Sequence, residues 1–524
     1  MSAVANLRYP APEPAAAWLR PSLDVTAFLV LLATLAHLGR RVPGALCHVF
    51  VVALLFVRVF RFVDGVEQRY LHRHFDIYLE LPLLPEAVRL LAATVPAQKL
   101  AIAGVLAIAA FAALAWVAAR ALAYARSYLG RAEGRRVFTV TCASLLLVAV
   151  LFEARDNGAN RAAVFAPSVA PPIAAQLSFW LSTDAYRSSK LAEVEARRAE
   201  LDRYSDALAG LGGASVLVFV VEAYGQTVFD SQEMRPRYAG LETAFRKAGY
   251  AVASTLLDSP VYGGGSWLAQ ATLITGVRVE NELDYALLKA QSPRTAAQLF
   301  RGAGYRTVLF HPGTTRAWPQ GDYLGFDVRY SAPDFEYRGP AFAWAPIPDQ
   351  YVVDFMHRRE VDRARRPLFA LCALVSSHAP FSEQPPLVED WSALDGGRVY
   401  SRLAPVRFAT SFTNLEHARP AYLRAIGYDL AVLEQYLTGF PNGDALVFVL
   451  GDHQPVGDVT GHSPRRGVPV HVLSRDLSLV DEFLVRGYTP GMWLGESRAS
   501  SSLARFLPTL LEVSEARRAA KVRP

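Results

Sequence analysis

Apolar residues are concentrated in the first third of the chain, in four stretches that approach the length of a membrane-spanning helix. A span takes about 20 mostly apolar residues. The four stretches are residues 23–38, 45–60, 100–124 and 137–152. Buried helices of a soluble protein are the alternative, but these stretches lie close together and have arginine-rich flanks. We therefore predict a transmembrane helix bundle over residues 1–153.

A fifth stretch, residues 76–95, has apolar residues at helical spacing but is interrupted by charged residues and by Pro82 and Pro85. We expect an amphipathic interfacial or re-entrant helix here instead of a full span. The loop 125–136 holds four arginines and one glutamate, and the positive-inside rule therefore places it in the cytoplasm. The chain then leaves the membrane for the last time near residue 153, with either four or five spans.

The pattern changes beyond the bundle. Residues 154–213 begin with small residues and prolines and continue as a charged amphipathic helix, which predicts a juxtamembrane linker. From residue 214, continuous apolar runs typical of buried strands alternate with helical patterns such as 295–304 and 421–440. The strand-like runs are 215–221, 250–255, 307–311, 368–377, 445–451 and 468–474. This order predicts an α/β domain over 214–515 with a mainly parallel central sheet, followed by a basic tail at 516–524.

Composition and charge agree with a membrane protein and exclude some other classes. The chain is 52% hydrophobic and 19% charged, with a formal net charge of +6. The basic residues lie mostly between apolar segments, where they determine topology, so we expect no nucleic-acid partner. The three cysteines show no CxxC spacing, which gives no support to a zinc knuckle or a disulfide framework.

Ionisable residues follow several of the predicted strands. Glu222 follows the first strand, and the pair Asp452 and His453 follows the strand at 445–451. His378 comes soon after the strand at 368–377. Each alone is more often a turn residue, and we expect His311 to be a core or turn residue. Strands that run in parallel end at one edge of a sheet, so the set predicts a divalent-metal site with oxygen and imidazole ligands.

The stretch SPVYGGGSWLAQATLITG places three glycines directly before Ser266. A flexible turn with a serine helix cap explains this pattern without any chemistry. A nucleophilic serine explains it as well, because glycines let a substrate approach the hydroxyl closely. We expect Ser266 to cap the helix that begins near Trp267 and also to be aimed at a substrate by it, since a helix N-terminus favours phosphate.

The order of these residues resembles that of the alkaline phosphatase/sulfatase superfamily, and the membrane-anchored lipoteichoic acid synthases and phosphoethanolamine transferases match best. That branch also has a membrane bundle before an external catalytic domain, so the resemblance covers essentially the whole chain. It implies that Glu222, Ser266, Asp452 and His453 bind one metal ion and that Ser266 is the nucleophile. It further implies that His378 contacts the substrate phosphate.

The chain departs from the family pattern in two places. Trp318 is kept, but Gln320 stands where the synthases have a phosphate-binding arginine. We take Arg316 as the substitute and His462 as a further substrate contact. Ser266 is followed by Trp267, Leu268, Ala269 and Gln270 instead of the x-P-x-R that formylglycine formation requires. Cleavage of sulfate esters is therefore disfavoured.

The resemblance implies a membrane-anchored phosphotransferase of the bacterial inner or cell membrane, multi-pass, with an extracytoplasmic catalytic domain. It would move a phosphoglycerol- or phosphoethanolamine-type group from a phospholipid to an envelope glycan or lipid, through a phosphoryl-serine intermediate. One divalent ion, manganese or zinc rather than magnesium, would assist. Two alternatives stay open: a phosphodiester or sulfate-ester hydrolase of the same fold, and an inactive protein that binds envelope polymer. The head group, the acceptor and the oligomeric state are also open.

Overall fold

The structure is a computed structural model in which the chain forms two compact units. Unit 1 comprises Met1–Arg69 and Arg73–Asp184, and unit 2 comprises Tyr70–His72 and Ala185–Pro524. The residues described are 20, 22–40, 43–85, 88, 89, 92, 95–155, 168–204, 207–315, 319–411, 415, 417–440, 443–461, 463–495, 497–499 and 501–522.

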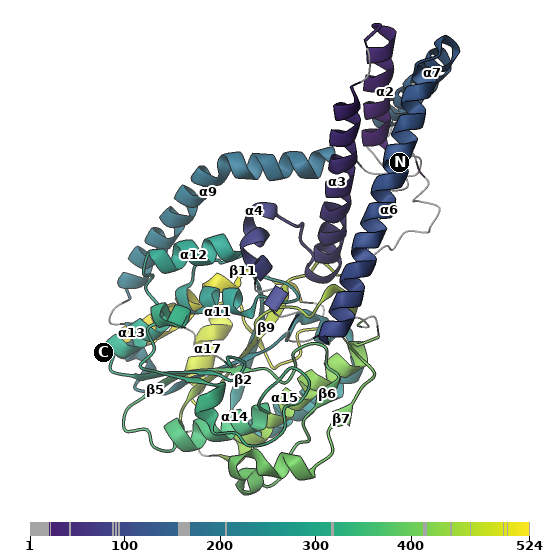
Figure 1. Ribbon diagram of the computed structural model, residues 1–524. Coiled ribbons are helices and arrows are strands. Elements are labelled where there is room, and N and C mark those ends of the chain that lie inside the picture. Colours follow the sequence, from purple (N-terminus) through teal and green to yellow (C-terminus); the bar gives the residue numbers. More distant parts are fainter. Residues whose placement is uncertain are drawn as a thin grey trace. The chain divides into compact units, whose positions relative to one another are not determined.

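Unit 1 is helical, and each of the four predicted spans falls within a helix (Figure 1). Its long helices are α2 (Leu23–His37), α3 (Gly44–Leu71), α6 (Ala97–Leu129) and α7 (Ala132–Arg155). Among the described residues, α3 and α6 are long and apolar enough to cross a membrane, and α2 is a shorter apolar helix. Two long apolar helices are thus present, and the number of spans, four or five, stays a prediction.

The predicted interfacial segment 76–95 begins as two short helices. Asp76 caps α4 (Ile77–Glu80) by accepting the N–H groups of Tyr78 and Leu79, and η2 (Leu81–Leu83) follows with a proline in its first turn. Several residues from 86 to 94 lie outside the described part of the chain. The proline at the start of η2 suits a helix N-terminus, where its missing N–H costs nothing.

Unit 2 is built on a nine-stranded sheet of order β10-β2-β9-β8-β1-β5-β3-β4, with β11 paired to β2. The strands are β1 (Val216–Val221), β2 (Ala251–Asp258), β3 (Arg306–His311), β4 (Val328–Ser331), β5 (Leu368–Leu374), β8 (Leu446–Gly451), β9 (Gly467–Ser474), β10 (Thr489–Pro490) and β11 (Ser501–Ser502). The central pairs β1–β5, β1–β8 and β3–β5 are parallel, whereas β9 runs antiparallel to β2 and β8. The predicted α/β fold with a mainly parallel sheet is confirmed.

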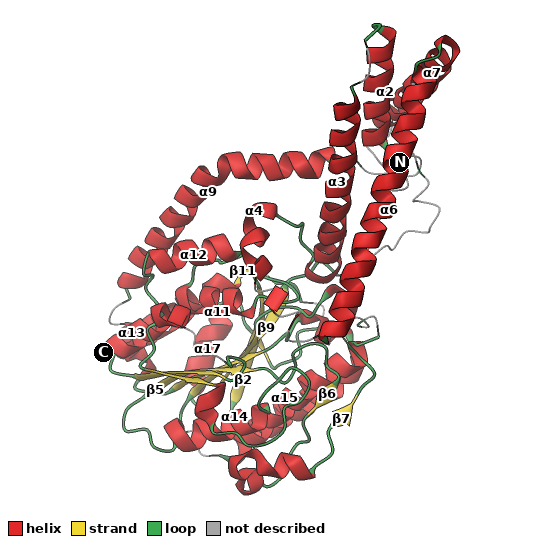
Figure 2. Cartoon of the chain, in the orientation of Figure 1, coloured by secondary structure: helices red, strands yellow, loops and turns green. Residues whose placement is uncertain are grey.

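Helices cover both faces of this sheet, which explains why its central strands β1, β5 and β8 are almost entirely apolar (Figure 2). All residues of β1 are buried. Alternate residues face two different cores: Leu217, Phe219 and Val221 belong to one, and Val216, Val218 and Val220 to the other. The first core includes α10 (Arg235–Lys247), α14 (Asp349–Met356) and α15 (Arg419–Gly439). The second includes α11 (Ser266–Thr275), α12 (Glu282–Ala290), α13 (Ala296–Gly302), α17 (Leu477–Val485) and α18 (Phe506–Val522).

The predicted linker and the predicted tail are both partly helical in the structure. Helix α9 (Ala170–Asp202) occupies most of the predicted linker, and from Ala185 onward it belongs to unit 2. Helix α18 continues through residues 516–522 of the predicted tail. Its first half is held by buried apolar residues such as Leu507 and Leu511. The helix then continues because the basic segment that follows contains no helix breaker.

Candidate active site

Strand ends bring three of the predicted metal ligands together. β1 and β8 are parallel neighbours in which Val221 pairs with Gly451, so the residues that follow, Glu222 and Asp452, leave the same edge of the sheet. His453 comes next. One ligand atom from each of Glu222, Asp452 and His453 lies within 4.8 Å of the other two, and all three residues are buried.

Ser266 joins this cluster from helix α11. Its hydroxyl donates to Glu222 Oε2 at 2.8 Å and lies 3.1 Å from His453 Nε2. The expectation that Ser266 caps the helix was wrong, because α11 begins at Ser266 and its N-cap residue is Gly265, with no side-chain cap. Gly265 has φ +81°, a left-handed conformation that glycine adopts without a steric penalty. The hydroxyl is therefore free to bond to the cluster.

The cluster carries more negative than positive charge. Burial alone would raise the pKa of Glu222, but the hydrogen bond and charge of His453 lower it to about 2. Burial and the charge of Glu222 raise the pKa of Asp452 to about 7. Burial opposes the charge of His453, yet the neighbouring carboxylates raise its pKa to about 9. Two buried carboxylates beside one imidazole are the environment in which a bound cation is most favourable.

The hydrogen bonds around the cluster fit a metal ion. Asp452 Oδ1 accepts the N–H groups of Ala223 and His453, whereas the buried Oδ2 has no hydrogen-bond partner. His453 Nδ1 lies 2.7 Å from the carbonyl of Gln454. A carbonyl only accepts, so Nδ1 carries a proton, and Nε2 points toward Glu222 and Ser266, where a bound cation would take the place of its second proton. This arrangement is typical of metal-binding histidines.

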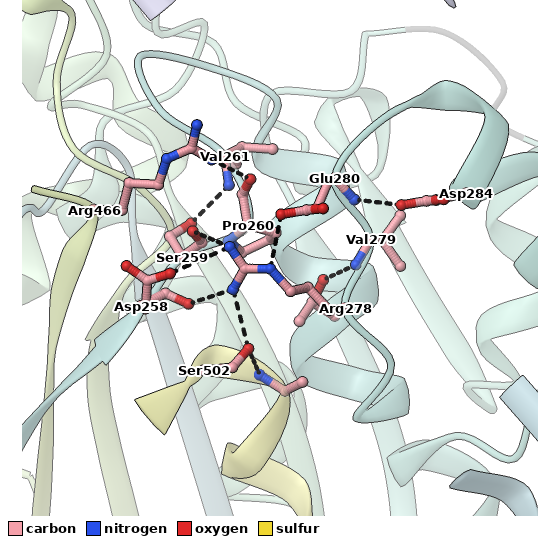
Figure 3. Close-up of polar contacts among 12 residues, drawn as sticks. Asp258, Ser259, Pro260, Val261, Arg278, Val279, Glu280, Asp284, Arg466 and Ser502 are labelled. Carbon is pink, nitrogen blue, oxygen red and sulfur yellow. Dashed lines mark hydrogen bonds and ion pairs between the residues drawn. The ribbon is translucent and has the colours of Figure 1, made fainter. Parts of the chain in front are cut away.

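The loop that leads to Ser266 is held by two arginines (Figure 3). The Arg278 guanidinium donates to the Asp258 carboxylate and carbonyl, to the Ser259 carbonyl and to the Ser502 hydroxyl at 3.2–3.3 Å, and to Glu280 at 2.8 Å. Arg466 donates to the carbonyl of Pro260 at 2.9 Å. Within the loop, the Ser259 hydroxyl donates to the carbonyl of Asp452 at 2.5 Å. These bonds tie the start of the glycine loop to the strand end that carries the metal-ligand candidates.

A cavity of about 520 Å³ opens beside the cluster and is lined by Glu222, Ser266, His378 and His453. The ring of His378 stacks on Trp344, with centroids 3.8 Å apart, and its Nδ1 lies 2.5 Å from the carbonyl of Ala379. The carbonyl again places the proton on Nδ1. Nε2 is then the atom of His378 that can accept a proton or a hydrogen bond.

His311 also lines this cavity. Its Nδ1 lies 2.5 Å from the Thr314 hydroxyl, and burial lowers its pKa to about 4, so the ring is neutral at physiological pH. The sequence analysis missed its place at the site, although its position directly after β3 was the available signal. Trp344 was missed as well, and its loop gives no pattern that would identify it.

Three predicted substrate contacts cannot be placed. Arg316, Trp318 and His462 lie outside the described residues.

Comparison with known proteins identifies the fold. A model of the sulfatase family, described as "Sulfatase", matches residues 241–513, which is just over half of the chain. The match includes Ser266, His378, Asp452 and His453, and Glu222 precedes it. No curated protein sequence matches the chain.

Solved structures give distant likenesses. The lipoteichoic acid synthase LtaP from Listeria monocytogenes is 15% identical over 58% of this chain and 72% of its own, with a TM-score of 0.38. The phosphoglycerol transferase GacH from Streptococcus pyogenes, in complex with sn-glycerol-1-phosphate, is 13% identical over 63% and 93%, with a TM-score of 0.38. The integral membrane lipooligosaccharide phosphoethanolamine transferase A from Neisseria meningitidis is 12% identical over 94% and 96%, with a TM-score of 0.44. The family model covers the larger part of unit 2, and the chain belongs to the sulfatase family, within the alkaline phosphatase superfamily of enzymes.

Proposed function

We propose that the protein transfers a phosphoryl-linked head group through a covalent intermediate on Ser266. One observation carries the proposal: the Ser266 hydroxyl lies between Glu222 and His453, at the N-terminus of α11 and beside a cavity. Because its hydrogen is donated to Glu222, an oxygen lone pair remains available for attack. The first turn of α11 adds N–H donors and a partial positive charge, both of which favour a phosphate group.

A metal ion completes the proposed site. Glu222, Asp452, His453 and the Ser266 hydroxyl would hold it, with the unpaired Asp452 Oδ2 as one ligand atom. A mixed carboxylate and imidazole set suits zinc or manganese better than magnesium. A divalent ion bound there supplies charge that lowers the pKa of the hydroxyl and neutralises phosphate oxygens.

The residues of the chain then carry the transfer in two balanced steps. The Ser266 oxygen forms a bond to phosphorus, its proton passes to Glu222 Oε2, and the bond to the donor alcohol breaks. His378 delivers a proton to the departing oxygen. In the second step an acceptor alcohol gives its proton to His378 Nε2 and forms the new bond to phosphorus. The bond to Ser266 breaks, and the serine oxygen takes back its proton from Glu222.

We assign the donor as a phospholipid with a phosphoglycerol- or phosphoethanolamine-type head group, and the acceptor as an envelope glycan or lipid. The apolar helices α3 and α6 support a membrane-anchored enzyme. The arginines where α6 ends and α7 begins (Arg126, Arg131, Arg135 and Arg136) support a catalytic domain outside a bacterial cell membrane. The order of Glu222, Ser266, His378 and Asp452-His453 along the chain, which resembles that of the membrane-anchored transferases, supports this choice of substrate.

The full-length protein in detergent tests this function. It is incubated with phosphatidylglycerol or phosphatidylethanolamine labelled in the head group, with and without zinc or manganese, and its peptides are analysed by mass spectrometry. We expect a head-group phosphate on the Ser266 peptide, no turnover by Ser266→Ala and retained turnover by Ser266→Thr. Full turnover by Ser266→Ala would contradict the proposal. Label that appears only in a free water-soluble ester would instead assign the site to hydrolysis.

A further inference from the structure

Unit 1 contains a second cavity, of about 630 Å³, formed by helices α3 and α9 and the short segment between α3 and α6. Its volume lies within the roughly 300–1,000 Å³ range of small-ligand pockets. Nine of its ten lining residues are apolar or aromatic. The lining residues are Phe56, Phe60, Ile77, Tyr78, Leu81, Pro82, Ile173, Gln176, Leu177 and Trp180.

The one amide side chain in this wall is hydrogen-bonded within the protein at both its oxygen and its nitrogen. Gln176 accepts the N–H of Ile77 through Oε1 and donates to the carbonyl of Phe75 through Nε2, both at 2.8 Å. These two bonds also fix α9 against the segment that follows α3. A cavity walled in this way selects hydrocarbon, because a polar ligand would lose its bonds to water without replacing them.

The mouth of the cavity is continuous with an exposed apolar stripe. On α3, Val49, Val52, Phe56 and Val59 are exposed at helical spacing, and Phe56 also lines the cavity. On α9, Leu177 and Trp180 are both exposed and part of the wall. Exposed apolar surface of this kind is costly in water and indicates contact with lipid or protein.

The course of the chain favours lipid. Helices α3 and α6 are the two helices in the described part of the chain that are long and apolar enough to cross a membrane. With both helices across the membrane, the segment that joins them lies at the membrane face where α3 ends. The start of α9 lines the same cavity as that segment, so it lies at the same face. The arginine-rich junction of α6 and α7, residues 126–136, lies at the opposite face. Trp180 and Tyr78 are residue types enriched where hydrocarbon meets water.

We propose that this cavity binds an acyl chain of the phospholipid donor and thereby makes the enzyme selective for lipids over soluble phosphodiesters. The inference rests on the proposed function, since it names the part of that substrate that lies away from the reacting phosphate. Helix α9 runs from the cavity wall into the catalytic unit, which resumes at Ala185. Binding energy from a remote part of the substrate is a general means of favouring the correct one.

Photo-cross-linking tests chain binding without requiring turnover. Full-length protein in nanodiscs receives a phospholipid with a diazirine on one acyl chain, and cross-linked peptides are mapped after illumination. We expect adducts concentrated on α4, η2 and residues 173–180 of α9, both in the wild type and in Ser266→Ala. Adducts spread evenly over the exposed residues of α3 and α6 would overturn the inference. Protein cross-links that join two copies through α9, with no lipid adduct, would assign the cavity to a dimer contact and overturn it as well.

Kinetics test whether the bound chain belongs to the donor. Leu177→Trp fills the cavity, and Leu181→Trp places the same bulk on an exposed position of α9 outside it. We expect Leu177→Trp to raise KM for a long-chain phospholipid about tenfold and to leave hydrolysis of bis(p-nitrophenyl) phosphate unchanged, which also shows that the catalytic unit is folded. Leu181→Trp should match the wild type with both substrates.

A second cavity-filling variant, Ile173→Trp, controls for a local effect of the substitution at Leu177. It should also raise KM for the lipid and leave hydrolysis of the soluble substrate unchanged. Equal behaviour of Leu177→Trp, Ile173→Trp and Leu181→Trp with the lipid would overturn the inference. Failure of the proposed function has a different signature: no turnover of either substrate by the wild type, with the cavity cross-link retained.

Discussion

Unit 2 contains two pairs of buried carboxyl groups, and the structure gives them different surroundings. Glu222 and Asp452 have His453 and Ser266 as neighbours and adjoin the cavity. Asp349, the first residue of α14, and Asp429, on α15, interact electrostatically, and neither carboxyl oxygen of Asp429 has a hydrogen-bond partner. Asp349 also accepts the N–H groups of Val375 and Ser376, both at 2.8 Å. Both pairs are almost completely inaccessible to solvent.

The difference lies in what compensates the buried charge. Burial raises the pKa of Asp349 to about 6, and burial together with the charge of Asp349 raises that of Asp429 well above its usual value. At neutral pH the raised pKa values leave one proton on this pair, so it carries one negative charge instead of two. The Glu222–Asp452 pair has the imidazole of His453 and the hydroxyl of Ser266 beside it instead and adjoins the cavity, a set that a cation satisfies. Two similar pairs thus serve different purposes: one fixes the loop before His378, and the other is a metal-ligand candidate.

The largest expected effect comes from removing charge at Asp452. Asp452→Asn should lower turnover by roughly a thousandfold or more, as for other groups that act as a catalytic unit. Bound metal, measured by inductively coupled plasma mass spectrometry, should be lost as well. Asp429→Asn is the matched control, because an amide can donate to Asp349, and it should retain both metal and turnover. Stoichiometric metal in purified Asp452→Asn would refute the assignment.

Adding metal should stabilise the folded protein through the Glu222–Asp452 pair and not through the Asp349–Asp429 pair. A ligand that binds only the folded state at a hundred times its Kd stabilises it by about 2.7 kcal/mol. We therefore expect zinc or manganese to raise the Tm of the wild type and of Asp429→Asn, and chelation to reverse the rise. Asp452→Asn should show no shift. An equal shift in all three proteins would place the ion elsewhere.

The Asp349–Asp429 pair should contribute more to the free energy of unfolding at acidic pH than at neutral pH. The pKa values of its carboxyl groups are raised in the folded state, so their contribution is full below about pH 4 and is lost as pH rises through about 6 and above. Asp429→Asn removes much of this dependence. Between pH 4 and 8, the wild type should lose roughly 2 kcal/mol more than the variant, as measured by urea unfolding at each pH. Buried histidines such as His471 titrate in both proteins and cancel in the difference. Parallel pH profiles would show that the pair holds no proton.

The sequence predicts one of these pairs and not the other, for a physical reason. Glu222 and Asp452 follow long apolar runs, and parallel strands must bring their ends to one edge. Asp349 follows no strand, and its partners Val375 and Ser376 are far from it in sequence, so no local pattern marks it. Edge strand β4 was missed for a related reason, because it is short and partly exposed.

The local sequence pattern also gives a wrong prediction where a side chain can bond either to its own helix or to a distant residue. A serine before a helix predicts a cap, yet Ser266 bonds to Glu222, which comes from β1. Sequence neighbours alone favour a helix cap, but the tertiary contacts with Glu222 and His453 determine where the hydroxyl points. This wrong expectation therefore concerns Ser266, the residue to which we assign the chemistry.

The two sides of the site also differ in how their loops are held, which gives the smallest predicted effect. Asp349 fixes the loop before His378 by accepting bonds, whereas Arg278 fixes the loop before Ser266 by donating them. Arg278→Ala should lower kcat about tenfold, equivalent to 1.36 kcal/mol, with little change in KM, because Ser266 would be less well positioned while the cavity is kept. Arg278→Lys should recover part of the loss through Asp258. Arg398→Ala, whose guanidinium pairs with the exposed Asp395, is the control and should change neither parameter. A rise in KM at constant kcat would instead place Arg278 in substrate binding and remove the contrast between the two loops.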